Sequence, residues 1–410
     1  MKKKKNPWFI TLIGALYFFY TYFHTNLMTS FNVSLSEYFN TSPSDIGILS
    51  SWFFYSNILF ILPAGIILDR FSIRTLMGIN MLIAVLGTVL FAFADSFFMI
   101  AISRFLPGIA TAFGLIICLK LAALWLPDDK MGLATSLIVS IGMLGAIVAQ
   151  APMVVLIELF SWQAALLISA IFGLIIAIIL WFNIIDPRND VKTIKSISIN
   201  KSLLMSIKEK QNWFCGLFIG LLNLPIAIFG AAFGSIYLMQ AYNYSSVQSG
   251  SIVSMLFIGM IIGAPLFGWV SDVIRSKKIP MLFGAAVSLI LIMFILYAPI
   301  YNNIISHIMF FLLGLSCSSQ LLAYPIVTEN NPIEISGVAL GLATLIIVGG
   351  GYGLGIPVVG KILDLFGNGK IINGIFTYSL AGYQRAFIII PIGIIISILL
   401  LFFIKEKKKV

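Results

Sequence analysis

The sequence has little charge: 10% of its 410 residues are Asp, Glu, Lys or Arg, whereas 60% are hydrophobic. Soluble globular domains carry about 25% charged residues, so this composition excludes that class. Acidic residues are the scarcer sign, 15 against 25 basic ones, and all of them fall in expected loops or at the ends of apolar runs. No apolar run therefore carries a carboxylate at its centre that could bind a cation, which disfavours a function in cation efflux.

Cysteine and histidine are also rare. The three cysteines (Cys118, Cys215 and Cys317) fall inside apolar runs, where we expect buried thiols rather than disulfides. No metal-ligand spacing, intramembrane acid pair or nucleophile–base pattern is present, so we expect no cofactor, no metal and no enzymatic activity.

Long apolar runs are abundant, and each is long enough to span a bilayer. Backbone groups in lipid must be satisfied within the segment, so these runs predict helices. The first run follows Lys2–Lys5 but is too long for a signal peptide, and we interpret it as a retained helix. We predict an all-α membrane protein with twelve transmembrane helices at 8–29, 46–68, 75–94, 97–125, 131–157, 163–185, 213–240, 247–271, 280–299, 303–327, 335–362 and 383–404.

Basic residues cluster in alternate loops. With a cytoplasmic N-terminus, 20 of the 25 fall on the inner side, six of them in the loop after residue 185. The positive-inside rule then predicts a multi-pass protein of the cell (inner) membrane with both termini in the cytoplasm. The net charge of +10 reflects this topology and attraction to lipid, not a nucleic-acid partner.

The chain reads as two copies of one unit. The polar stretch 186–212 is a predicted cytoplasmic linker between an N-terminal six-helix bundle (1–185) and a C-terminal one (213–410). Gly65-x-x-x-Asp69-Arg70-x-x-x-Arg74 after the second helix has a counterpart in Gly268-x-x-x-Asp272-x-x-Arg275 after the eighth. Two such halves predict alternating access around a site near the membrane midplane.

Arg104 is the most informative residue, because it lies inside the apolar run 97–125 with no local counter-charge. Intramembrane ionisable groups usually face a cavity and act on a substrate or ion. Pro107 and Gly108 beside it indicate a closely packed helix. We interpret Arg104 as an anchor for a substrate carboxylate.

Polar residues concentrate in helices 1, 2, 4, 5, 7 and 10, whereas helices 3, 6, 9 and 12 are nearly all apolar and expected to face lipid. On helix 1, steps of three and four residues place Tyr17, Tyr20 and His24 on one face. The candidate substrate-binding residues are Arg104, Tyr17, Tyr20, His24, Asn57, Gln150, Asn223, Tyr237, Gln320 and Tyr324.

Each candidate has an alternative. The tyrosines can be packing aromatics with satisfied hydroxyls, and Asn223 and Gln320 can join helices. Lys120 lies about 24 Å beyond Arg104 along an ideal helix, so an inner-gate contact or snorkelling is favoured for it. His307 near the outer end of helix 10 is expected to be interfacial.

The run from Gly65 to Arg74 resembles the loop 2–3 signature of the major facilitator superfamily, and Arg104-x-x-x-Gly108 resembles its fourth-helix motif; Ser72 and Ile73 depart from the pattern. The resemblance implies a gate at the cytoplasmic side formed by Gly65, Asp69, Arg70, Arg74, Asp272 and Arg275.

At finer grain, several stretches are similar to phagosomal-transporter (Pht) type nutrient carriers of intracellular bacteria and to the related lysosomal dipeptide carriers. These are Tyr17–Phe23, Phe53–Ser56, Leu62–Gly65, Gly142–Ala146 and Tyr378–Ala381. Carriers of that kind take up amino acids, small peptides or similar nutrients. His24 and Ile61 depart from their common arginine and glutamine.

The sequence therefore predicts a monomeric secondary or facilitative transporter that imports a small carboxylate-bearing nutrient, such as an amino acid, a short peptide or a pantothenate-like acid. Protons are a candidate coupling ion. The alternatives are a siderophore or organic-anion exporter and, from another class, a transport-derived receptor.

Overall fold

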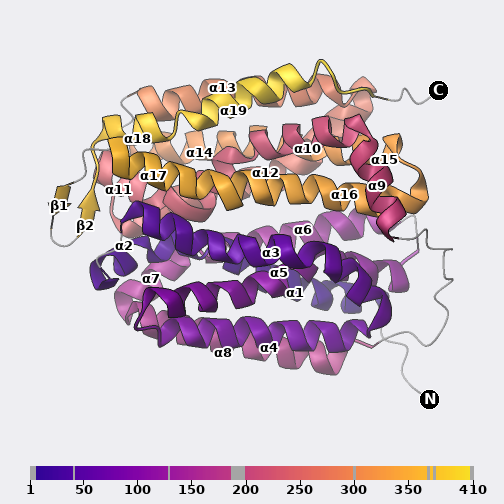
Figure 1. The fold of residues 1–410 in the computed structure, drawn as a ribbon, viewed down its shortest axis with the longest axis horizontal. Helices are drawn as coiled ribbons and strands as arrows, with labels where there is room; N and C mark the ends of the chain where they lie inside the picture. Colours follow the sequence, from indigo (N-terminus) through magenta and orange to yellow (C-terminus); the bar gives the residue numbers. More distant parts are fainter. Residues whose placement is uncertain are drawn as a thin grey trace. The chain divides into compact units, whose positions relative to one another are not determined.

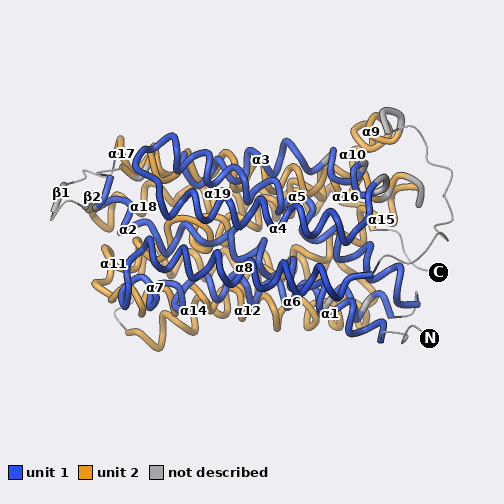
Figure 2. The backbone as a smooth tube through the Cα atoms, turned by 90° about the horizontal axis from the view of Figure 1, so that it is seen from below, with its two compact units in different colours: residues 1–40, 48–190 blue, residues 41–47, 191–410 orange. Residues whose placement is uncertain are grey.

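The computed structural model describes residues 6–39, 42–127, 130–185, 199–298, 302–366, 370–372 and 375–406. These residues are almost entirely helical (Figure 1). Two compact units divide the chain, residues 1–40 with 48–190 (unit 1) and residues 41–47 with 191–410 (unit 2) (Figure 2). The division at 190/191 falls within the predicted linker.

Unit 1 is built from long helices joined by short turns. Its elements are α1 (Pro7–Asn26), α2 (Met28–Phe39), α3 (Pro43–Arg70), α4 (Ile73–Ala92), α5 (Phe97–Trp125), α6 (Met131–Val148), α7 (Ala151–Leu159) and α8 (Trp162–Asn183). Within it, α1 packs mainly on α5 and α6, and α4 packs on α5 and α8.

Unit 2 has more helix breaks. Its elements are α9 (Ile199–Lys208), α10 (Lys210–Leu222), the π-helix η2 (Ile226–Phe233), α11 (Gly234–Tyr242), α12 (Ser246–Ile274), α13 (Lys278–Tyr297), α14 (Asn303–Cys317), the 3-10 helix η3 (Ser318–Leu322), α15 (Ala323–Asn330), α16 (Ile333–Ile347), the π-helix η4 (Val348–Gly355), α17 (Ile356–Phe366), the antiparallel hairpin β1 (Lys370–Ile372) and β2 (Ile375–Thr377), α18 (Leu380–Ala386) and α19 (Ile389–Leu400). The first turn of α3 also belongs to unit 2, although the rest of that helix belongs to unit 1.

Each of the twelve apolar runs falls on one helix or on consecutive helices. Among the described residues, nine helices are long and apolar enough to cross a membrane, and a tenth span is the pair 210–222 and 226–242, bent by 49°. Asn223 and Pro225 lie at that bend, and proline removes the backbone donor that would continue the α-helix. The predicted linker is partly helical, because α9 lies inside it and α10 already begins at Lys210.

The helix ends follow local capping chemistry. Ser96 and Ser161 accept a hydrogen bond from the backbone three residues on, at the starts of α5 and α8, and Ser245 with Gln248 forms a capping box on α12. Ser72, which departs from the family loop pattern, caps α4 by accepting from the Thr75 amide at 3.1 Å. The serine thus contributes to helix initiation at this turn.

A glycine mediates a close helix contact in each unit. A Cβ added to Gly108 on α5 would lie 1.9 Å from the Ser56 Oγ and 2.1 Å from the Phe53 carbonyl oxygen of α3. In unit 2, a Cβ on Gly314 of α14 would lie 1.9 Å from the Leu256 carbonyl oxygen of α12. The fourth predicted span (α5) therefore packs on the second (α3), and the tenth (α14) on the eighth (α12), each through a glycine that lets the backbones approach.

Candidate functional site

Arg104 lies inside unit 1 and is 1% exposed, the largest of the fully buried side chains. Its Nη2 donates a hydrogen bond of 3.0 Å to the backbone oxygen of His24, and its Cζ lies 4.8 Å from the centroid of the Phe53 ring. Nε and Nη1 have no hydrogen-bond partner among the described residues. A buried guanidinium whose N–H groups and positive charge have no hydrogen-bond or carboxylate partner among the described residues is suited to bind an anion.

His24 lies beside Arg104 and is also 1% exposed. Its Nε2 is 3.2 Å from the Thr88 hydroxyl of α4, and that hydroxyl donates its single hydrogen to the Ala84 carbonyl at 2.8 Å. With the threonine hydrogen on that carbonyl, Thr88 accepts from the imidazole and Nε2 carries the ring hydrogen. Nδ1 has no partner among the described residues. The bonding pattern leaves Nδ1 as the ring atom that can gain or lose a proton.

The surrounding helices hold this pair in place. Gly108 brings α5 against Phe53 and thereby puts the Arg104 guanidinium over an aromatic face, a favourable cation–π arrangement. Gly87 of α4 faces Pro107, where an added Cβ would lie 2.8 Å from the Ser103 carbonyl oxygen, the acceptor that the proline leaves free. Asn57 is buried on α3, one turn beyond Phe53 on the same face.

The other two helix 1 candidates are satisfied by backbone. The Tyr17 hydroxyl donates to the Ala110 carbonyl at 2.6 Å, and the Tyr20 hydroxyl donates to the Ser169 carbonyl at 3.2 Å. Both side chains are 0% exposed. This is the packing alternative, although the Tyr20 ring also lies edge-on to the His24 ring at 4.7 Å. Gln150 is buried at the junction of α6 and α7, where the Ser30 hydroxyl meets the Ala149 carbonyl at 2.6 Å.

A polar cluster lies in unit 2 where three helices leave α-helical geometry. The Asn223 Nδ2 donates to the Tyr352 hydroxyl at 3.1 Å, and the Gln320 Nε2 donates to the Asn223 Oδ1 at 3.2 Å. Asn223 ends α10, Gln320 lies in η3 and Tyr352 in η4. Discontinuous helices and π-helical turns often mark binding sites in transporters. Tyr324 lies near this cluster, beside Thr344 of α16.

Tyr237 belongs to a different environment. Its hydroxyl donates to the Ile295 carbonyl at 2.8 Å, and its ring packs among Phe229, Tyr383 and Phe387. The structure therefore brings Arg104 together with His24, and Asn223 with Gln320, while Tyr237 lies in an aromatic core of unit 2.

The predicted gating residues are only partly described, because the side chains of Asp69 and Arg70 lie outside the described residues. Arg74 stacks on Trp181 of α8, with its Cζ 4.6 Å from the ring centroid. Among the described residues, a Cβ on Gly65 or Gly268 would meet no atom within 4 Å. Asp272 and Arg275 are exposed.

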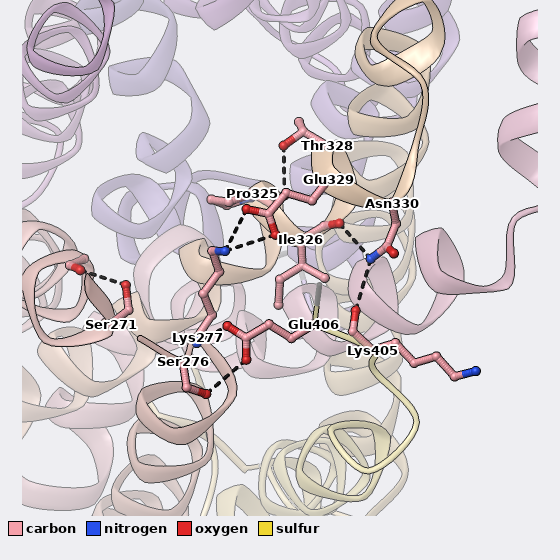
Figure 3. A network of polar contacts seen from close by, with 11 residues as sticks. Ser271, Ser276, Lys277, Pro325, Ile326, Thr328, Glu329, Asn330, Lys405 and Glu406 are labelled. Atoms are coloured by element: carbon pink, nitrogen blue, oxygen red, sulfur yellow. Dashed lines mark hydrogen bonds and ion pairs between the residues drawn. The ribbon is translucent and has the colours of Figure 1, made fainter. Parts of the chain in front are cut away.

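An unpredicted network occupies the end of unit 2 that carries the C-terminus (Figure 3). Lys277 pairs with Glu329 of α15 at 2.8 Å. The Glu406 carboxylate accepts from the Lys277 amide and the Ser276 hydroxyl, so it caps the start of α13. Asn330 donates to the Lys405 carbonyl at 3.1 Å. The C-terminal segment thus ties α13 to α15.

The two doubtful residues have structural partners. The Lys120 Nζ donates to the Leu68 carbonyl at 2.7 Å, near the C-terminus of α3, where backbone carbonyls lack helical partners. This contact agrees with the inner-end role favoured for Lys120. His307 has partners at both ring nitrogens, the Ser251 hydroxyl at 2.9 Å and the Asn303 carbonyl at 2.8 Å, so it links α12 to its own helix α14.

Sequence reasoning missed three members of these clusters. Thr88 lies on helix 3, which was expected to face lipid, yet it is 1% exposed and bonds His24. Tyr352 had a usable signal, since it is a lone tyrosine within the glycine run 349–353. Phe53 had no such signal beyond its place in Phe53–Ser56, one of the stretches similar to the Pht-type carriers. Within the described ranges, no group of three His, Cys, Asp or Glu residues could hold a metal ion.

Membrane-length apolar helices and a buried arginine within one of them are typical of a multi-pass membrane transporter. A model of the Major Facilitator Superfamily matches residues 13–356, and the chain belongs to that family. The predicted twelve-helix major facilitator fold is confirmed.

Several curated relatives align along most of the chain. The uncharacterized transporter YybO of Bacillus subtilis (strain 168) is 23% identical and covers 92% of this chain and 87% of its own. The membrane sensor protein UhpC of Escherichia coli (strain K12) is 24% identical, with 82% of each chain covered. The probable galactarate/D-glucarate transporter GudP of Bacillus subtilis (strain 168) is 21% identical, with 83% and 82% covered.

Solved structures share the fold. A bacterial homolog of the human lysosomal transporter Spinster, in an inward-facing and occupied conformation, matches with a TM-score of 0.79. It covers 98% of this chain and 97% of its own at 15% identity, a likeness that concerns the fold alone.

Proposed function

We propose that this transporter imports a small carboxylate-bearing nutrient across the cytoplasmic membrane by alternating access. Arg104 of unit 1 holds the carboxylate. An amino acid, a short peptide or a pantothenate-like acid fits this chemistry, as in the Pht-type carriers that the sequence resembles.

The observation that carries the proposal is the uncompensated charge of Arg104. An arginine at the centre of a membrane helix costs about 2.5–3.5 kcal/mol on insertion scales. Here that group is 1% exposed, and its Nε and Nη1 have no partner among the described residues. A substrate carboxylate would supply the missing charge and acceptors together. GudP, whose name gives a dicarboxylate substrate, supports the same class.

The test is ligand-induced thermal stabilisation of the purified protein. The probes are L-glutamate, L-alanyl-L-alanine, pantothenate and D-glucarate, with panthenol and D-glucitol as neutral counterparts of the last two. A true ligand at a hundred times its Kd adds about 2.7 kcal/mol to the stability of the wild type. In Arg104→Gln we expect the affinity to fall about 10- to 100-fold, because a charge-assisted hydrogen bond is lost.

Arg104→Lys is the matched control, since it keeps the charge but not the planar fork, and we expect an intermediate loss. Equal stabilisation of wild type and Arg104→Gln by the same carboxylate would show that Arg104 is structural.

A receptor is the second candidate, favoured by the similarity to the sensor UhpC. Proteoliposomes separate the two functions: a carrier accumulates or exchanges the stabilising compound, whereas a receptor binds it without moving it. Vesicles of both orientations also distinguish import from export of an organic anion.

A further inference from the structure

The buried site in unit 1 contains one atom with no assigned role, the Nδ1 of His24. Nε2 carries the ring hydrogen when the Thr88 hydroxyl donates to the Ala84 carbonyl, 2.8 Å away, and accepts from the imidazole. Nδ1 is buried and without a partner among the described residues. It is therefore a basic lone pair held inside the protein next to a guanidinium.

The charges around this ring are few. Arg104 of α5 contacts the His24 backbone oxygen, and Tyr20 of α1 lies against the imidazole ring. Of the other helices packed on α1, α6 and α8 contain no charged residue. On α4 the only charge is Arg74, at the opposite end of the helix. On α2 the only charged residue is Glu37, thirteen residues beyond His24 in the sequence. Arg104 therefore dominates the field at the imidazole.

We propose that Nδ1 of His24 is the proton-binding site of an anion–proton symport mechanism. The inference rests on the proposed function, because it uses an anion bound at Arg104. Without the anion, protonation would place two positive charges side by side in a poorly solvated site, which is unfavourable. With a carboxylate bound to Arg104, the charge of the guanidinium is neutralised, so protonation of His24 no longer places two uncompensated positive charges side by side. Anion and proton therefore bind together.

The stoichiometry follows from the charge balance. The empty site carries one positive charge, that of Arg104. A monoanion and a proton together leave that total unchanged, which favours one proton for each carboxylate held. The proton adds to the Nδ1 lone pair and leaves from the same atom, so no other bond changes.

The first experiment needs no substrate. The chain has only two histidines, so His307→Gln leaves His24 as the single imidazole. In protein labelled with ¹⁵N-histidine, nitrogen chemical shifts report the tautomer and the charge. We expect the Nε2–H tautomer at neutral pH. In Arg104→Gln on this background, the titration midpoint of the ring should rise by about one pH unit or more, a tenfold change in proton affinity. Arg104→Lys, which keeps a positive charge beside the ring, should leave the midpoint unchanged.

The second experiment measures coupling. Proteoliposomes loaded with the pH dye pyranine receive L-glutamate, pantothenate or D-glucarate, and we expect interior acidification with each anion that enters. His24→Gln should abolish acidification and uphill accumulation. His307→Gln, whose ring nitrogens both have partners, should behave as wild type.

The outcomes separate the two proposals. Identical midpoints in the Arg104 and Arg104→Gln proteins, or acidification that persists in His24→Gln, would overturn the proton site. If no carboxylate moves in any protein, the proposed function fails, and the ¹⁵N titration still decides whether Arg104 controls protonation of His24.

Discussion

Arg104 and Tyr17 show how two polar residues on neighbouring membrane helices serve different ends. Burying a polar group is costly unless its hydrogen bonds are made. The Tyr17 hydroxyl makes its bond to the Ala110 carbonyl, whereas the Arg104 Nε and Nη1 have no partner among the described residues. Tyr17 thus stabilises the contact of α1 with α5, and Arg104 retains binding capacity.

Tyr17→Phe tests this distinction. The substitution removes one buried hydrogen bond, so we expect a loss of about 0.5–1.5 kcal/mol in the free energy of unfolding. Transport KM should stay within about twofold of the wild type, since the hydroxyl is bonded to backbone. The measurements are thermal unfolding in detergent and uptake in proteoliposomes. A large increase in KM with unchanged stability would instead place Tyr17 in contact with the substrate.

Among whole elements, the contact of α5 with α3 positions the site. The glycine four residues after Arg104 is what lets the two backbones approach, and the approach sets Phe53 under the guanidinium. The corresponding contact of α14 with α12 through Gly314 lies in the other unit, which also contains the Asn223 cluster.

Gly108→Ala should therefore be strongly destabilising. The added methyl group would overlap the Ser56 Oγ and the Phe53 carbonyl, and the backbone atom cannot move without separating the helices. Overpacking of this kind costs about 1–3 kcal/mol. The matched control is Gly65→Ala on α3, where the methyl group meets no atom of the described residues within 4 Å and alanine is the better helix former. Thermal unfolding of both variants checks the prediction; equal melting temperatures would contradict it.

At the level of the whole molecule, topology follows from charge placement. Asp95 and Phe71 lie in exposed turns at opposite ends of α4, so they belong on opposite sides of the membrane. The three native cysteines are at most 1% exposed and give a low labelling background.

In intact cells, Asp95→Cys should react with a membrane-impermeant maleimide, and Phe71→Cys should react only after lysis. Quantitative labelling in intact and lysed cells provides the measurement. The reverse pattern would place the N-terminus outside and remove the positive-inside argument.

The sequence by itself determined the membrane-spanning runs and their number, and it singled out Arg104 as a charge inside one of them. Apolar length and charge spacing are local properties, and lipid permits few backbone structures. It also identified His24, Asn223 and Gln320 as polar residues in membrane helices, but not what each of them touches.

Only the tertiary structure decided which polar groups are satisfied. Thr88 meets His24 across 64 residues of sequence, and Tyr352 meets Asn223 across 129. Tyr17 looked like a binding residue by the same periodicity that placed His24 beside it. Hydrogen-bond partners depend on which helix faces pack together. That packing joins residues far apart in the sequence, and the local pattern around one of them does not specify the other.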